Sequence, residues 1–315
     1  MNSVKDEVLR VLENNTGEYF SGETLAKNLG VSRAAVNKAI KSLSGEGYEI
    51  DAVTNKGYSL VGGDILSAAS VRGFLPERYE SIKINFFKST DSTNNEAKRV
   101  IYVEEKPSVF IADEQTGGRG RLGRSFYSPS GESVYLSLLL KPKTNMGLKI
   151  TSLVAVAVCR AIESLTYQKA EIKWVNDVFI GGKKVAGILC EGVSGFESNE
   201  IDAVVIGVGL NCRAKFPAEL KDIAGNILEN VSVTRSALAS KVIENVLDIL
   251  DDLDNAKIMD EYRKRSLVLG EEVRFFENNE WHEGKVTNIL DDGSLEINNG
   301  EKIINSGEVT VRKKQ

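Results

Sequence analysis

The chain has 315 residues, 42% hydrophobic and 27% charged, which is typical of an ordinary soluble protein with two or three domains. Its formal net charge of -5 excludes a polycation, so any contact with nucleic acid must come from a local basic patch. The single histidine, His282, excludes a histidine-based zinc site and disfavours a Ser-His-Asp mechanism.

The first 62 residues have the pattern of a winged helix-turn-helix. Apolar residues recur at helical spacing over 4–12, and Ser21 caps a second helix that Gly30 ends. A third helix is expected over 33–43, after a short turn. The stretch YEIDAVTNKGYSL, 48–60, then predicts a β-hairpin with a tight turn, which would be the wing.

The third helix is the basic element of this domain, because no acidic residue lies between Val31 and Gly45. Its polar residues are of the types that contact phosphates and base edges in a major groove. The residues that we expect to contact DNA are Ser32, Arg33, Asn37 and Lys38. A solvated helix face in a protein-docking module is the alternative interpretation.

Residues 63–265 mix strands and helices. Apolar runs predict strands over 82–89, 108–114, 133–142 and 201–212. Helical spacing predicts a central helix over 150–165 and an amphipathic helix over 235–253. The segments 171–180 and 183–193 are interpreted as a hairpin around Gly181 and Gly182. Because these elements do not alternate as βαβ units, the fold class is α+β.

The pattern changes again at residue 266. Short β-type runs are divided by Asn-Asn, Asp-Asp-Gly and Asn-Asn-Gly, so 266–315 is expected to be a small β-barrel-like domain. The predicted domains are therefore 1–62, 63–265 and 266–315.

Features of export and membrane insertion are missing from the sequence pattern. The longest apolar run, 153–159, is far shorter than the ~20 residues that cross a bilayer. The acidic, helix-patterned N-terminus is not a signal peptide. Cys159, Cys190 and Cys212 lie far apart in apolar segments, which indicates buried thiols in a reducing compartment. We expect a cytoplasmic protein without a membrane partner.

The segment GGRGRLGR, 117–124, is called the Gly-Arg loop below. It contains a G-x-G-x-x-G pattern, but Pro129 and Gly131 prevent the helix that a dinucleotide-binding turn requires. It is not a P-loop, because no Gly-Lys-Ser/Thr follows. Its glycines let backbone N–H groups approach a ligand, and its arginines can bind phosphate or carboxylate. A flexible surface loop and an RNA-binding Gly-Arg tract are the alternatives.

Together the motifs give a specific resemblance. They are DSTNNEA (91–97), DEQTGGRGRLGR (113–124), YSPSG (127–131), KWVNDVFI with KKVAGILCE (173–191) and GVGLN (207–211). In this order, after a winged helix, they resemble the bifunctional biotin–protein ligases that also repress the biotin operon. Two departures are Val175, where the family usually has proline, and Phe126, where tryptophan often follows the loop.

This resemblance implies a central mixed sheet of the class II synthetase kind and an SH3-like C-terminal barrel. It also implies a reaction in which biotin and ATP form biotinyl-5′-adenylate, which then acylates a lysine of a biotin carboxyl carrier protein. Mg²⁺ is expected to assist at the phosphates. No protein nucleophile is needed, and no protein ligand to a metal is assigned.

The resemblance also implies the roles of individual residues. Arg119, Arg121 and Lys184 would be catalytic. The biotin site would comprise Ser92, Thr93, Asn94, Gln115, Arg119, Gly120, Arg121, Lys184 and Gly187, and the ATP site Arg121, Arg124, Lys173, Asn176, Asp177 and Asn211. From the residues alone, Thr93 and Asn94 could instead cap a helix, Lys184 could be solvated and Gly187 could mark a bulge.

Regulation follows from the same resemblance. A homodimer formed in the adenylate-bound state would present two winged helices to a two-fold operator, with the adenylate as corepressor. Three alternatives stay open: a lipoate–protein ligase, a transcription factor that only binds a metabolite, and a ligase whose N-terminal module no longer reads DNA.

Overall fold

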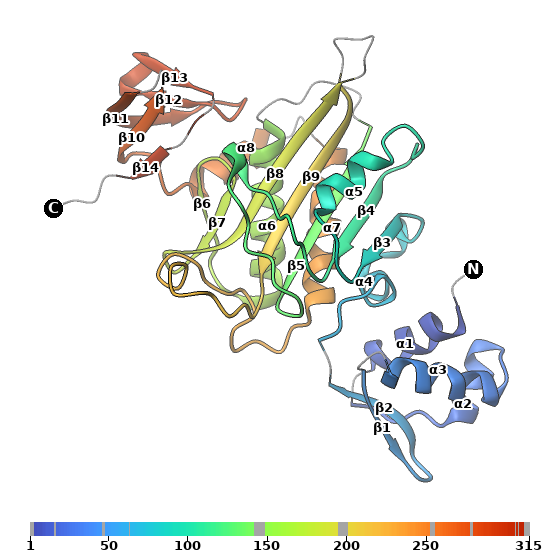
Figure 1. Cartoon of the computed structure of the whole chain (residues 1–315). Helices are drawn as coiled ribbons and strands as arrows, with labels where there is room; N and C mark the ends of the chain where they lie inside the picture. The colour runs from blue at the N-terminus through green and yellow to red at the C-terminus, as the bar shows by residue number, and fades with distance from the viewer. Residues whose placement is uncertain are drawn as a thin grey trace. The chain divides into compact units, whose positions relative to one another are not determined.

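The computed structural model describes residues 3–15, 17–45, 48–62, 64–141, 149–194, 201–252, 256–277, 280–305, 307 and 309–311. They form two compact units (Figure 1). Unit 1 comprises Met1–Ser81 with Thr234–Lys241, and unit 2 comprises Ile82–Val233 with Val242–Gln315. The predicted domain boundaries after residues 62 and 265 stay predictions.

Unit 1 contains the predicted winged helix-turn-helix. Its helices are α1 (Val4–Asn14), α2 (Gly22–Leu29) and α3 (Arg33–Gly45), and its wing is the antiparallel pair β1 (Glu49–Val53) and β2 (Gly57–Gly62). A capping box at Ser3 starts α1, and Ser21 accepts a hydrogen bond from the Thr24 amide at the start of α2. The helices, the caps and the hairpin are thus confirmed.

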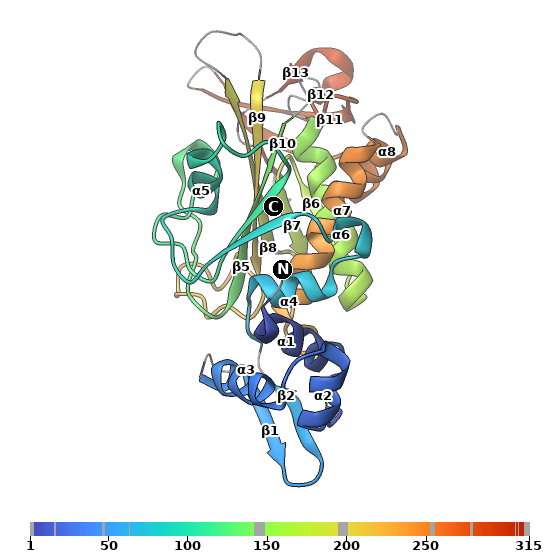
Figure 2. The same ribbon diagram turned by 90° about the vertical axis from the view of Figure 1, so that its right-hand side faces the viewer.

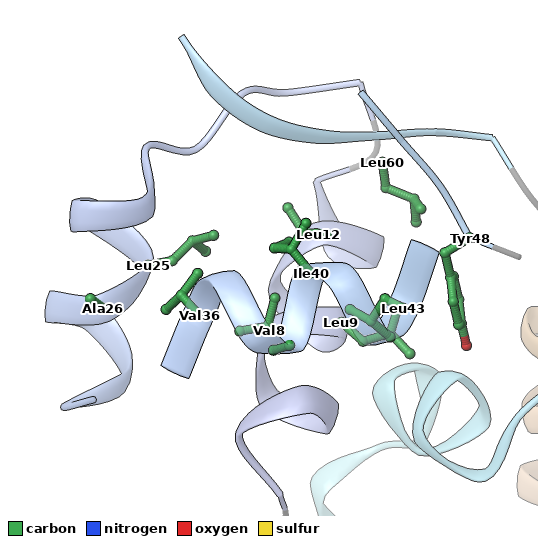
Figure 3. Close-up of a cluster of buried hydrophobic side chains, with 11 residues drawn as sticks. Val8, Leu9, Leu12, Leu25, Ala26, Val36, Ile40, Leu43, Tyr48 and Leu60 are labelled. Carbon is green, nitrogen blue, oxygen red and sulfur yellow. The ribbon is translucent and has the colours of Figure 1, made fainter. Parts of the chain in front are cut away.

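The core of unit 1 is built by one face of each helix and by two residues of the wing region. Figure 3 shows these side chains meeting between the helices. They include Val8, Leu9, Leu12, Leu25, Ala26, Val36, Ile40, Leu43, Tyr48 and Leu60. Helix α4 (Ala68–Phe74), which the sequence pattern did not predict, packs on α1, and the Tyr48 hydroxyl bonds to Ser67 and Ser70. A 3₁₀ turn, η1 (Glu77–Tyr79), follows.

The centre of unit 2 is a mixed sheet with strand order β3-β4-β5-β9-β8-β7-β6 in the described residues. Among the strand pairs that the described residues form in this sheet, β3–β4 is parallel and the others are antiparallel. The strands are β3 (Lys83–Phe87), β4 (Ser108–Ala112), β5 (Ser133–Leu140), β6 (Glu171–Lys173), β7 (Asp177–Ile180), β8 (Lys183–Ser194) and β9 (Ile201–Asn211). Residue 142, at the end of one predicted strand, lies outside the described residues.

Helices cover both faces of this sheet. Helix α5 (Thr93–Arg99) lies on one side, and α6 (Lys149–Thr166) and α8 (Ala256–Arg265) lie on the other (Figure 2). Helix α7 (Arg235–Asp251) is the predicted amphipathic helix, although residue 253 of its predicted span lies outside the described residues. The α+β class is confirmed.

One predicted element is wrong. The segment 171–180 is not a single strand, because residues 174–176 form a turn that separates β6 from β7. The turn is held by Asn176, whose carbonyl oxygen accepts from the Ile188 amide at 2.9 Å and whose Nδ2 donates to the Ile188 oxygen at 2.9 Å. The predicted hairpin is therefore a three-stranded meander, β6-β7-β8.

The C-terminal region is an antiparallel sheet with order β13-β12-β11-β10-β14 in the described residues. Its strands are β10 (Glu272–Glu277), β11 (Glu280–Ile289), β12 (Leu295–Ile297), β13 (Lys302–Ile304) and β14 (Val309–Val311), with a 3₁₀ turn η3 (Asn298–Gly300). The pairing seen among these residues leaves β13 and β14 as the two edges and does not close a barrel.

Two further observations concern the described part of the chain. Cys159, Cys190 and Cys212 are all free thiols. Its helices are all too short or too polar to cross a membrane.

Candidate active site

Two facing glycines form the floor of a cavity in unit 2. Gly187 of β8 pairs with Gly209 of β9, and the ring of Phe126 lies against both. A Cβ at position 209 would be 2.5 Å from the Phe126 ring, and one at position 187 would be 3.1 Å from it. Only glycines therefore let an aromatic ring or a ligand lie flat on these strands.

One wall of the cavity is made by the start of α5. The Thr93 amide and hydroxyl both donate to Oε1 of Gln115, at 2.9 and 3.1 Å, and Nε2 of Gln115 donates to Ser128 Oγ at 3.2 Å. The N-cap residue Ser92 makes no side-chain capping bond. Gln115 is thus fixed in one orientation at the cavity wall.

Asn94 occupies the base of this wall and is almost fully buried. Its Oδ1 accepts from Ser137 Oγ at 2.6 Å, and its Nδ2 donates to Glu191 Oε2 at 2.7 Å and to the Leu189 oxygen at 3.3 Å. Lys98 pairs with the other oxygen of Glu191 at 2.6 Å. The Asn94 side chain therefore hydrogen-bonds to residues of the central sheet instead of capping α5, and Nδ2 donates to two of them.

The Gly-Arg loop forms the rim as a narrow turn. The Gly117 amide donates to the Asp91 oxygen at 2.8 Å, the Gly120 amide to the Arg124 oxygen at 2.7 Å and the Phe126 amide to the Gly118 oxygen at 3.0 Å. A 3₁₀ turn, η2 (Arg121–Gly123), lies at its tip, and the chain continues at Arg124 in an extended conformation. No α-helix follows the loop directly, in agreement with the prediction.

Asp91 anchors the base of this loop. Both of its carboxylate oxygens accept from Arg99, each at 3.0 Å. These bonds, with a further one from Asn95, hold the pKa of Asp91 well below its usual range. The carboxylate therefore stays ionised and keeps α5 attached to the loop.

Positive charges from two segments face the cavity. Arg121 is half-buried, which lowers its pKa, while the nearby Asp177 carboxylate favours its charged form. Its Nη1 donates to Asn176 Oδ1 at 3.4 Å. Lys184 Nζ pairs with Asp177 Oδ1 at 2.7 Å and lies 6.0 Å from the centre of the Phe126 ring. Such a set of donors suits an anion that carries more than one negative group.

The turn between β6 and β7 is fixed from the outside. The indole N–H of Trp174 donates to the Gly293 oxygen of the C-terminal sheet at 2.8 Å, and the Tyr262 hydroxyl of α8 donates to the Val175 oxygen at 3.3 Å. Burial raises the pKa of Tyr262, so this hydroxyl remains a donor. The turn thereby holds Lys173, Asn176 and Asp177 toward the cavity.

The predicted ligand-binding residues come together with one exception. A cavity of about 170 Å³ is lined by Ser92, Thr93, Asn94, Gln115, Arg119, Gly120, Arg121, Arg124, Lys173, Asn176, Asp177, Lys184 and Gly187. Asn211 is not among its lining residues; its Nδ2 donates to the Lys184 oxygen at 3.3 Å, so it contacts the strand that carries Lys184. Val309 of β14 and the preceding Gly307 also line the cavity.

Sequence reasoning missed three residues of this network. Ser137 bonds to Thr93 and Asn94, Glu191 holds Asn94, and Trp174 ties the turn to the C-terminal sheet. A signal for Ser137 was present, because a serine inside a buried apolar strand needs a partner.

The predicted DNA-contacting residues lie on α3 in unit 1. Ser32 Oγ accepts from the Ala35 amide at 3.1 Å and so caps the helix. Arg33, Asn37 and Lys38 are exposed, whereas Val36 and Ile40 of the same helix are buried. Among the residues that the structure describes, no group of three His, Cys, Asp or Glu side chains could hold a metal ion.

Comparisons with known proteins agree with this arrangement. Residues 86–211 match the biotin/lipoate A/B protein ligase family, and residues 5–59 match an HTH domain. The chain is 31% identical to the bifunctional ligase/repressor BirA of Bacillus subtilis, over 98% of this chain and 99% of that protein. It is 31% identical to the BirA of Escherichia coli over 79% of this chain and 77% of that one. A biotin protein ligase from Aquifex aeolicus, solved with biotin and ATP, superimposes with a TM-score of 0.63 and 30% identity, covering 74% of this chain and 99% of that one.

Proposed function

The chain belongs to the family of bifunctional biotin ligases and repressors, and from this premise we propose how its residues carry out both functions. It is a biotin–[acetyl-CoA-carboxylase] ligase that uses biotin and ATP, and a DNA-binding repressor. A carboxyl carrier protein is the acceptor that this activity implies.

The proposed reaction has two steps. In the first, a carboxylate oxygen of biotin attacks the α-phosphorus of ATP, a new P–O bond forms and pyrophosphate leaves. In the second, the neutral amine of the acceptor lysine attacks the carbonyl carbon of the mixed anhydride. The C–O bond breaks, AMP leaves with that oxygen, and the nitrogen releases a proton to solvent. The protein supplies position and charge rather than a nucleophile.

The vitamin half of the site is assigned to the α5 wall and the glycine floor. Ser92, Thr93 and Gln115 would contact the ureido ring of biotin, and Gly187 would let the ring system lie against β8. Asn94 was predicted to bond the ring directly. Because both of its donors are engaged by Glu191 and Leu189, it would instead fix the shape of the wall.

The reacting groups are assigned to the Gly-Arg loop and Lys184. Arg119, Arg121 and the Gly120 backbone would surround the carboxylate and then the adenylate phosphate. Lys184 would bridge the carboxylate and the α-phosphate, exchanging its ion pair with Asp177 for these anions. Bringing two anions together is the main electrostatic cost of the first step, so these cations lower its barrier most.

The triphosphate half is assigned to Arg124 and to the turn that holds Lys173, Asn176 and Asp177. Asn211 would act on the nucleotide through Lys184, whose carbonyl oxygen it holds. One carboxylate together with phosphate oxygens is a common environment of Mg²⁺, and Asp177 is the carboxylate in the cavity lining. Bound there, Mg²⁺ would neutralise the charge of the leaving pyrophosphate.

The repressor function is assigned to unit 1. Helix α3 would enter the major groove with Ser32, Arg33, Asn37 and Lys38. We also propose that the adenylate-bound protein forms a homodimer, so that two such helices meet a two-fold operator. For the C-terminal sheet we propose an SH3-like relationship, and for the central sheet a class II synthetase relationship.

The observation that best supports the ligase mechanism is the convergence of Arg121, Lys184 and Gln115 on one cavity from three separate segments. The test is to incubate purified protein with radiolabelled biotin and ATP and to extract the bound product with acid. We expect protein-bound biotinyl-5′-AMP with biotin, and no protein-bound lipoyl-AMP when lipoate replaces biotin. Lipoyl-AMP as the preferred product would contradict the proposal. Incorporation of biotin into a carrier protein, read by avidin blot, separates a ligase from a protein that only binds biotin.

A further inference from the structure

The wing of unit 1 contacts the exposed face of α3. The hydroxyl of Tyr58, at the start of β2, donates to Oδ1 of Asn37 at 2.7 Å. Asn37 lies in the second turn of α3, where recognition helices place residues that contact base edges. The contact therefore involves a residue assigned to reading DNA.

Tyr58 is held rigidly by its own backbone. Its amide donates to the Phe20 oxygen at 2.8 Å, and its oxygen accepts from the Phe20 amide at 2.9 Å. The preceding Gly57 has a φ of 108°, and a Cβ there would lie 2.1 Å from the Phe20 oxygen. Only glycine fits this position, so the close approach of the wing to Phe20 fixes where the Tyr58 hydroxyl lies.

A fixed hydroxyl orients the amide of Asn37. The bond from Tyr58 engages one of the two lone pairs of Oδ1, whereas both N–H groups of Nδ2 keep their capacity to donate. Asparagine reads adenine by donating to N7 and accepting from N6–H, which requires both ends of the amide. Guanine offers two neighbouring acceptors, N7 and O6, in the major groove.

We propose that Tyr58 is a specificity-determining residue of the repressor, which favours Asn37 as a hydrogen-bond donor to guanine. Tyr58 acts through Asn37 and does not need to touch a base itself. This inference rests on the proposed placement of α3 in the major groove. Beyond that placement, we infer which base Asn37 selects and that Tyr58 of the wing causes this selection.

The test is selection of binding sites from a random-sequence duplex library by the full chain, with biotin and ATP present. We compare the wild type with Tyr58→Phe and Asn37→Ala. The matched control is Tyr19→Phe, because the Tyr19 hydroxyl also donates within unit 1, at 2.5 Å, but to Asp51 of β1 instead of a residue of α3. Circular dichroism establishes that each variant is folded.

The wild type and Tyr19→Phe should select guanine at the position where Asn37→Ala selects no base. Tyr58→Phe should admit adenine there and lose about tenfold of the preference for guanine, the scale of one base contact. An unchanged preference in Tyr58→Phe, or adenine selected by the wild type at that position, would overturn the inference while leaving DNA binding intact. If the wild type enriches no sequence, the proposed DNA contact of α3 fails and the inference with it.

Discussion

Replacing Gly207 with alanine should disrupt the vitamin half of the site through Asn94. The added Cβ would lie 2.3 Å from Oδ1, 2.9 Å from Cγ and 3.0 Å from Nδ2 of Asn94. Atoms that are not bonded do not approach so closely, so the Asn94 side chain must move. Gly207 pairs with Ser137 in the sheet, and backbone movement there would break the β5–β9 ladder.

The size of the effect follows from the bonds that Asn94 loses. Its bond with the Ser137 hydroxyl contributes about 1 kcal/mol and its bond with the Glu191 carboxylate about 2 kcal/mol. We therefore expect the free energy of unfolding to fall by about 3 kcal/mol. Because Asn94 lines the cavity, its displaced side chain should also weaken biotin binding by ~10-fold or more. Urea unfolding measures the first quantity and titration calorimetry the second.

A double-mutant cycle tests the cause. In an Asn94→Ala background, the obstacle is gone and Gly207→Ala should cost less than about 0.5 kcal/mol. The matched control is Gly192→Ala on β8, which should cost little, because the three atoms nearest to the added Cβ all belong to the Ile201 side chain, at 3.3 Å or more. If Gly207→Ala costs the same with and without Asn94, the reasoning is refuted.

Four other outcomes are expected. Arg121→Ala should release biotinyl-5′-AMP about 10 to 100 times faster, because a charged hydrogen bond to the phosphate is lost; retention equal to that of the wild type in gel filtration would count against the loop assignment. Removal of residues 1–62 should abolish operator binding in a gel shift, and a truncated protein that still shifts operator DNA would refute the placement of the DNA-reading surface. Burial raises the pKa of Glu13 from an ordinary 4.5 to about 7. Between these two pH values the folded state keeps a proton that the unfolded state releases. The free energy of unfolding should therefore fall by about 3 kcal/mol as pH rises from 4.5 to about 7, and stay level above that. Glu13→Gln should remove this pH dependence in urea unfolding, and an unchanged pH dependence would mean that another group causes it. Trp174→Phe should raise the KM for ATP about fivefold by losing one hydrogen bond and leave biotin affinity unchanged, with Trp281→Phe as control; equal changes for both substrates would mean a general loss of stability.

The parts of the fold that local patterns encode could be predicted. The apolar runs at 133–140 and 201–211 became the adjacent central strands β5 and β9, because a strand buried on both faces needs continuous apolar residues. Ser21 and Ser32 marked helix starts, because their hydroxyls satisfy amides that the helix leaves free. The Gly-Arg loop stood out through composition alone.

The parts that depend on distant partners could not be predicted. The break between β6 and β7 depends on two hydrogen bonds between Asn176 and the backbone of Ile188 on β8. The local sequence gives no sign of this break, because the apolar residues Ile172, Trp174 and Val175 are typical of a strand. The Asn94–Glu191 bond joins residues 97 positions apart, and the Trp174–Gly293 bond joins residues 119 positions apart. No local periodicity carries such contacts, so the support of the site became visible only in three dimensions.

We propose that guanidinium, ammonium and backbone N–H groups around one cavity bind the carboxylate of biotin as it joins the α-phosphate. A crystal structure of the protein with its own biotinyl-5′-AMP tests this most directly. We expect the phosphate of the adenylate within hydrogen-bonding distance of Arg121 and Lys184, with the biotin rings between Thr93 and Gly187. An adenylate bound elsewhere, with the Gly-Arg loop directed away from it, would contradict the account.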